Sequence, residues 1–139
     1  MPDIPPESEP MQGFNAVLGF RRPAWREGYA RLEFDIAPQH LNRSGILHGG
    51  VISALLDATL GFTGVYPTAP GRRRRAVTLS ISVAFLGQTS TGTITCIAER
   101  TGGGKSVFMA TGAVTSADGT KLATAQGVFR YIADVARAP

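Results

Sequence analysis

The chain has 139 residues, a length typical of one domain, and it carries 14 basic side chains against 10 acidic ones. Four of the basic side chains are consecutive (Arg72, Arg73, Arg74 and Arg75), so the remainder is balanced at 10 against 10, which argues against a general nucleic-acid coat protein. A single cysteine and two histidines without metal-ligand spacing exclude an intramolecular disulfide and predict no metal centre, and no apolar run is long enough to cross a membrane.

The first ten residues are rich in proline and acidic side chains, and they lack the basic start and apolar run of a signal peptide. We expect residues 1–10 to be a disordered or loosely packed lead-in, residues 11–139 to form one domain, and the protein to be cytoplasmic. Mixed spacing of the apolar positions in residues 11–20 predicts a short helix leading into an edge strand. Residues 29–36 alternate between apolar and charged side chains, which predicts a strand with one buried face.

A long apolar segment without proline spans residues 49–65. It is too long for one strand and apolar nearly all round, so it predicts a buried helix. After the arginines, alternation predicts four consecutive antiparallel strands at residues 77–85, 92–100, 106–115 and 122–132, with a strong hairpin signal at Asp118-Gly119. This order predicts an α+β fold in which an antiparallel sheet wraps around one long helix.

Asp57 is the single formally charged side chain between Ser44 and Gly71, and it falls in the middle of the predicted helix. A carboxylate among core residues loses solvation unless it is paired or hydrogen-bonded. Such violations of local rules concentrate at functional sites. The alternative is a structural carboxylate that accepts a hydrogen bond from a neighbouring strand or faces a subunit interface.

The sequence His48-Gly49-Gly50 opens the same helix. The first backbone N–H groups of a helix have no internal partner and lie at its partially positive end, so they can bind a carbonyl oxygen that gains negative charge during a reaction. The alternative interpretation of these three residues is a plain loop-to-helix junction. Gly49 and Asp57 are eight residues apart, about 12 Å of helix rise, so one chain cannot place both on one atom. If both act on one substrate, the protein is at least a dimer with composite sites, in which two copies of the helix run antiparallel about a two-fold axis.

Residues 42–50 read Asn-x-x-Gly-x-x-His-Gly-Gly, and an Asp follows nine residues after the His. This pattern resembles the signature of the hotdog-fold thioesterases of the PaaI type. Residues 76–80, the Gly104-Lys105 pair and the Asp118-Gly119 hairpin are also similar, so the resemblance covers about residues 11 to 133. It implies a hotdog fold and hydrolysis of an acyl-CoA thioester, with no metal and no cofactor, since coenzyme A is part of the substrate.

The resemblance also implies a role for each matching residue. Asp57 would be either the general base that activates water or the nucleophile that attacks the thioester. The backbone N–H of Gly49 would form the oxyanion hole, and Asn42 and His48 would shape and hydrogen-bond this pocket. Thr78 would orient the water, with Ser80 as the alternative if the strand register shifts.

Members of this family usually form tetramers of two dimers and hold the coenzyme A nucleotide on their surface. Arginine suits its phosphates, and we expect one or two of the four consecutive arginines to touch the ligand. The candidates for the nucleotide are Arg72, Arg73, Arg74, Arg75, Gly103, Gly104 and Lys105, and those for the acyl pocket are Phe62, Phe14, Leu18 and Met109. The acyl group would be aromatic, such as phenylacetyl or hydroxyphenylacetyl, or an alkyl chain of medium length.

Three other functions compete with hydrolysis. The first is a hotdog protein that binds acyl-CoA without turnover, as a sensor or carrier. The second is a nucleic-acid binder that uses the arginine run, which would need interleaved aromatic side chains that the run lacks. The third is a hotdog hydratase, which typically pairs Asp and His within one reach, whereas Asp57 and His48 are too far apart on one helix. We expect no nucleic-acid and no membrane partner.

Overall fold

The computed structural model describes residues 9–69 and 73–133. Helix α1 (Gly13–Val17) leads directly into strand β1 (Arg21–Arg26) at one edge of the sheet, which confirms the predicted helix and edge strand. Strand β2 (Tyr29–Asp35) buries Ala30, Leu32 and Phe34, as its alternation predicts. Within these described ranges, no helix is long and apolar enough to span a bilayer.

The central helix α2 (Gly49–Phe62) ends three residues earlier than predicted. Its buried side chains recur as pairs four residues apart, so they form one stripe that faces the sheet: Val51, Ile52, Leu55, Leu56, Thr59 and Leu60. The opposite face carries Ala54, Asp57, Ala58 and Gly61 and is partly exposed. The expectation of a helix buried all round is therefore wrong for the single chain. The second face is apolar mainly because it carries small residues, and no other part of the chain covers these residues completely.

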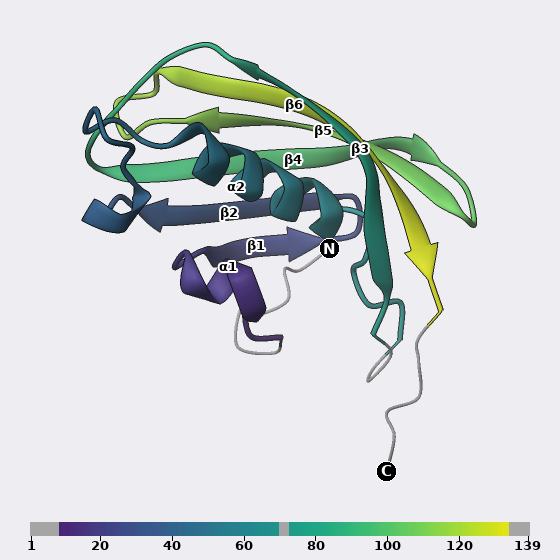
Figure 1. The fold of residues 1–139 in the computed structure, drawn as a ribbon. Coiled ribbons are helices and arrows are strands. Elements are labelled where there is room, and N and C mark those ends of the chain that lie inside the picture. Colours follow the sequence, from purple (N-terminus) through teal and green to yellow (C-terminus); the bar gives the residue numbers. More distant parts are fainter. Residues whose placement is uncertain (1–8, 70–72, 134–139) are drawn as a thin grey trace.

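Strands β3 (Arg75–Phe85), β4 (Thr93–Gly103), β5 (Val107–Thr115) and β6 (Lys121–Ile132) confirm the four predicted strands. All six strands form one antiparallel sheet in the order β1-β2-β4-β5-β6-β3 (Figure 1). Strand β3 pairs with β6 rather than with the next strand in the chain, so β2 and β4 become neighbours. The hairpin between β5 and β6 turns at Gly119, whose φ of +88° explains the glycine.

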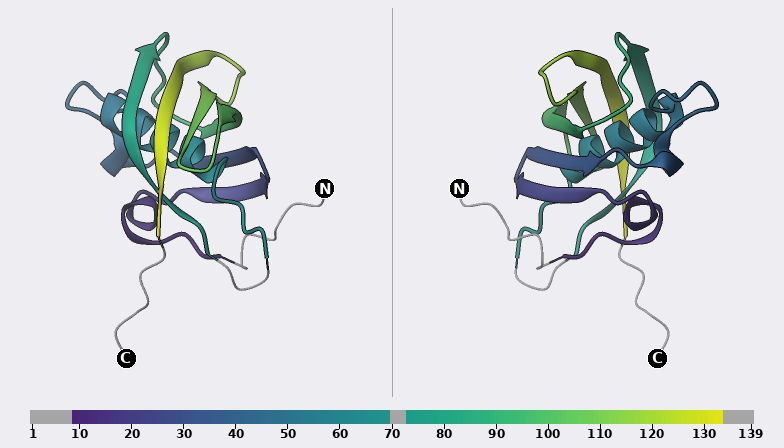
Figure 2. Two further views of the ribbon diagram at one scale, coloured as in Figure 1. Left: turned by 90° about the vertical axis from the view of Figure 1, so that its right-hand side faces the viewer. Right: turned by 90° about the vertical axis from the view of Figure 1, so that its left-hand side faces the viewer.

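The sheet twists strongly and curls around α2 (Figure 2). Two glycines on the sheet allow the helix to lie close, because a Cβ added to Gly112 or Gly127 would come within 2.7 or 3.2 Å of the Leu60 side chain. The end of α2 is tied to β1 by Trp25, whose indole N–H donates to the carbonyl of Phe62 at 2.8 Å. The helix therefore has a fixed position and direction relative to the strands.

Strand β3 forms the other edge of the sheet and is mostly exposed. Val77, Leu79 and Phe85 are 38%, 54% and 55% exposed. A long apolar edge strand of this kind is a template for pairing with another strand.

Candidate active site

The loop before α2 is fixed by Asn42. Its Oδ1 atom accepts the backbone N–H groups of Ser44 and Ile46 at 2.9 and 3.1 Å. Gly45, with φ of +76°, completes the turn by donating its N–H to the carbonyl of Asn42. Asn42 thus shapes the segment that delivers the chain to the start of the helix.

His48 is the N-cap of α2. Its Nδ1 atom accepts the N–H of Gly50 at 2.7 Å, which requires an unprotonated Nδ1 and satisfies one of the free donors of the helix. A Cβ on Gly50 would lie 2.8 Å from that nitrogen, so the ring position depends on glycine. The N–H of Gly49 has no hydrogen-bond acceptor among the described residues and remains available at the positive end of the helix.

Asp57 and Thr78 are joined by the bond that defines the site. The hydroxyl of Thr78 donates to Oδ1 of Asp57 at 2.6 Å, while Oδ2 has no hydrogen-bond partner within the described ranges. Asp57 is half-buried and faces β3, so its predicted place in the hydrophobic core is wrong. Ser80 lines a hollow on the outer face of the sheet instead, so Thr78 is the hydroxyl at this carboxylate.

A cavity of about 290 Å³ opens at Asp57 and Thr78. Its walls come from the N-terminal segment, α1, α2, the loop before β3, β3 and β6. Apolar walls are supplied by Ala58, Phe62, Val65 and Phe129, and polar or charged ones by Glu9, Asn15, Arg73, Arg74 and Arg75. Phe62 is the one of the four predicted acyl-pocket residues that lines this cavity.

The predicted arginines have different surroundings. Arg72 lies outside the described residues. Arg73 pairs with Glu9 (Nε to Oε1, 3.7 Å), and Arg74 pairs with Glu27 at 3.5 Å while its guanidinium lies over the Tyr131 ring. Arg75 lines the cavity, and it has no ion pair with any residue that the structure describes.

The glycine-rich segment forms the turn between β4 and β5. Gly103 has φ of +128° and contacts the backbone of the following strand so closely that no Cβ would fit there. Gly104 donates its N–H to the carbonyl of Val107, and Lys105 is exposed. None of the three lines the Asp57 cavity. The turn nevertheless lies beside the C-terminal end of β6, because the N–H of Tyr131 donates to the carbonyl of Ser106.

The other predicted acyl-pocket residues lie elsewhere. Leu18 packs against the core, and Phe14 is 65% exposed on α1. Met109 alternates with the buried Phe108 and Ala110, so it faces away from α2 and does not belong to this cavity. In their place the cavity uses Glu9 and Asn15, which the sequence did not point to because neither belongs to a motif or a periodic pattern.

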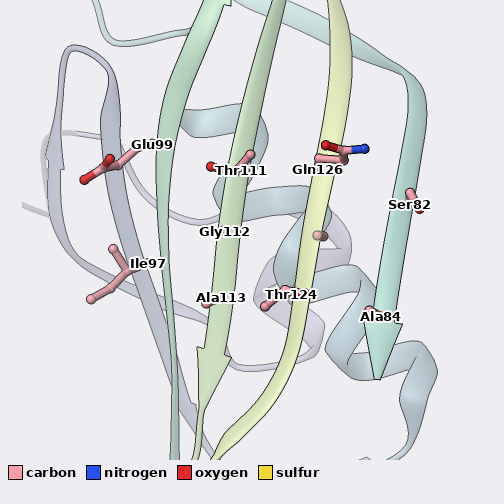
Figure 3. A pocket seen from close by; sticks show the side chains of 10 residues that line it. Ser82, Ala84, Ile97, Glu99, Thr111, Gly112, Ala113, Thr124 and Gln126 are labelled. Atoms are coloured by element: carbon pink, nitrogen blue, oxygen red, sulfur yellow. The ribbon is translucent and has the colours of Figure 1, made fainter. Parts of the chain in front are cut away.

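A larger hollow of about 550 Å³ lies on the outer face of the sheet (Figure 3). Its lining from β3, β4, β5 and β6 is made mostly of small and hydroxyl side chains, and Glu99 is its one charged residue. Thr111 lies opposite Glu99 in this lining, but no hydrogen bond joins the two side chains, so the hollow lacks an equivalent of the Asp57–Thr78 pair. In the described part of the chain, no three His, Cys, Asp or Glu side chains come together as metal ligands would.

A model of the thioesterase superfamily matches residues 44–123, which is more than half of the chain. No curated protein sequence matches significantly. The conserved protein PA5202 from Pseudomonas aeruginosa superposes with a TM-score of 0.79 at 24% identity, over 88% of this chain and 95% of that one. Thioesterase HI1161 from Haemophilus influenzae gives 0.76 at 19% identity (85% and 81% covered), and the PaaI protein from the E. coli phenylacetic acid degradation operon gives 0.74 at 21% (86% and 83%). The chain therefore belongs to the thioesterase superfamily and has the hotdog fold that its sequence predicts.

Proposed function

We propose that this protein is a PaaI-type acyl-CoA thioesterase of the cytoplasm, with Asp57 as its catalytic carboxylate. The observation that carries the proposal is the 2.6 Å hydrogen bond from Thr78 to Asp57 at the wall of the cavity. This bond fixes the carboxylate through Oδ1, while Oδ2 has no hydrogen-bond partner among the described residues. A carboxylate held in this way can take a proton from water or attack a carbonyl carbon.

In the general-base route, Asp57 removes a proton from a water molecule that attacks the thioester carbonyl. In the nucleophilic route, Asp57 attacks first and water then hydrolyses the resulting anhydride. In both, the carbonyl oxygen gains negative charge and accepts a hydrogen bond from the N–H of Gly49, which the helix dipole reinforces. The leaving thiolate belongs to a thiol with a pKa of about 8.5, so no strong general acid is required.

We propose a dimer in which each site uses both chains. Phe85 lies against Gly49, and Thr78 binds Asp57, so α2 and β3 run antiparallel. The start of the helix therefore lies beside the end of β3, and Asp57 lies beside the beginning of β3. Antiparallel pairing of two exposed β3 edges about a two-fold axis brings the Gly49 end of one chain to the Asp57 end of the other. A tetramer of two such dimers is the assembly we propose.

Arg75 is the arginine best suited to a phosphate of coenzyme A, because it lines the cavity without an ion pair to any described residue. Arg73 and Arg74 would first have to release Glu9 and Glu27. We assign Gly103, Gly104 and Lys105 to the more distant part of the nucleotide. Phe62 supplies an apolar wall for an aromatic or medium-chain acyl group.

The test is a panel of aromatic and medium-chain acyl-CoA substrates with detection of the free thiol, run on the wild type and on Asp57→Asn. We expect hydrolysis by the wild type and a loss of about 100-fold or more in kcat for the variant, the scale of general acid–base catalysis. Asp118→Asn is the matched control, because Asp118 is an exposed carboxylate in the turn between β5 and β6, and it should keep full activity.

Equal rates for the wild type and Asp57→Asn would refute the role of Asp57. Binding of acyl-CoA without turnover of any substrate would instead identify the protein as a non-catalytic sensor or carrier.

A further inference from the structure

The aromatic ring of Phe85 lies against the first residue of α2. Its Cε1 and Cζ atoms are 3.3 and 3.5 Å from the position that a Cβ on Gly49 would occupy. The side chain is nevertheless 55% exposed, so much of its apolar surface is in contact with solvent. This ring belongs neither to the Asp57–Thr78 pair nor to the Asp57 cavity.

The free N–H of Gly49 and the ring of Phe85 are thus neighbours at one end of β3. The Asp57–Thr78 pair lies at the other end, seven residues away along the strand, or about 23 Å. A two-fold axis that passes between Ile81 and Ser82 would place Phe85 opposite Thr78 of a second chain. In the proposed dimer the ring therefore enters the composite site from the side of the oxyanion hole.

We propose that Phe85 is a substrate-positioning residue, whose ring forms the apolar wall of the thioester site beside the Gly49 N–H. This inference rests on the proposed function. The exposed ring gains an apolar partner when the first carbons of the acyl group pack against it. It also excludes water from the developing oxyanion, and a drier site strengthens the hydrogen bond from Gly49.

Leu86 provides a matched control. It is the next residue in the chain and is 57% exposed, and its backbone N–H donates to Leu122 whatever its side chain. If exposed apolar surface at this end of β3 mattered only for folding or association, truncation of either side chain would have similar effects. If the ring positions substrate, only Phe85 matters.

The experiment compares Phe85→Ala, Phe85→Tyr and Leu86→Ala with the wild type on acetyl-CoA and hexanoyl-CoA, with the melting temperature and the oligomeric state measured for each. We expect Phe85→Ala to lower kcat/KM for hexanoyl-CoA about 10- to 100-fold and to affect acetyl-CoA less, because the ring packs on acyl carbons beyond the carbonyl. Phe85→Tyr keeps the ring and should retain most of the activity, as should Leu86→Ala.

Equal loss on both substrates together with dissociation of the oligomer would overturn the proposal, and so would unchanged kinetics in Phe85→Ala. If the wild type hydrolyses neither these two substrates nor any member of the aromatic and medium-chain panel, the proposed function fails. Calorimetry with a non-hydrolysable hexyl-CoA thioether decides the role of Phe85 whenever hexanoyl-CoA is not turned over. Weaker binding of the thioether by Phe85→Ala than by Leu86→Ala would then support the role of the Phe85 ring as an apolar wall. Equal binding by the two variants, or no binding even by the wild type, would refute that role.

Discussion

The reactive pair consists of a carboxylate on α2 and a hydroxyl on an edge strand. Thr78→Val keeps the shape of the side chain and removes the donor to Asp57, so the carboxylate loses its fixed orientation. A hydrogen bond to a charged group contributes about 1.5–3 kcal/mol, which corresponds to a loss of roughly 10- to 100-fold in kcat. Steady-state kinetics on one acyl-CoA measure this loss, and Thr78→Ser should restore most of it.

Ser80→Ala provides the comparison for this prediction. Ser80 lies two residues along β3 but lines the outer face of the sheet, so its hydroxyl cannot reach Asp57. We expect wild-type kinetics for Ser80→Ala. A loss equal to that of Thr78→Val would mean that the Thr78 hydroxyl has no special role.

At the level of single residues, the sequence singled out the candidate residues better than it predicted their surroundings. A lone carboxylate in an apolar helix marked Asp57, and the His48-Gly49-Gly50 motif marked the helix start. The half-exposed position of Asp57 was missed, because apolar composition does not show which small residues a single chain leaves uncovered. Phe85 was also missed, since it looks like any apolar residue of a strand until the fold places it beside Gly49.

At the level of elements, the hairpin between β5 and β6 depends on Asp118. Its carboxylate accepts hydrogen bonds from the Ser116 hydroxyl and from the Thr120 N–H, and these bonds, led by that of Ser116, lower the pKa of Asp118 from 3.8 to about 2. A carboxyl with a lowered folded-state pKa stabilises the protein above its ordinary pKa, and that contribution is lost as the pH falls through the folded value.

We therefore expect the hairpin to open more readily as the pH falls from 5 towards 2, measured by amide hydrogen exchange in β5 and β6. In Asp118→Asn the side chain does not titrate, so its exchange should depend less on pH over this window. Asp35, whose pKa is lowered by hydrogen bonds from Arg21 and Thr93, titrates in both proteins and cancels in the comparison. Identical pH profiles would show that the turn carboxylate does not stabilise the hairpin.

The elements themselves were largely predictable, because periods of two and of about 3.6 are local properties of the chain. Six of the seven predicted segments lie within a few residues of the observed strands and of α2, and the seventh correctly combined α1 with β1. The sheet order was not predictable in the same way. Alternation shows which face of a strand is buried but not which strand lies beside it, so the pairing of β3 with β6 became visible only in the fold.

At the level of the whole molecule, the edge position of β3 matters for the proposed dimer. Gly49 and Asp57 lie on one helix about 12 Å apart, and residues 9–69 and 73–133 place no N–H donor in hydrogen-bond contact with Asp57, whose partner is the Thr78 hydroxyl. The exposed β3 edge supplies a means of bringing a second copy to the site. In the proposed dimer, the complete catalytic machinery belongs to the assembly rather than to one chain.

Mixed dimers test this arrangement directly. Asp57→Asn removes the carboxylate, and Gly49→Pro removes the N–H at the first helical position, where proline is well tolerated and where the exposed Phe85 ring has room to shift. Each variant alone should be inactive. After the two variants are unfolded and refolded together, half of the dimers contain one chain of each variant. Each of these mixed dimers has one intact composite site out of two, so about a quarter of wild-type activity should return.

Refolding each variant alone is the control and should restore nothing, while circular dichroism checks that Gly49→Pro keeps its helix. If mixing restores no activity although mixed dimers form, both groups act within a single chain and the composite site is wrong.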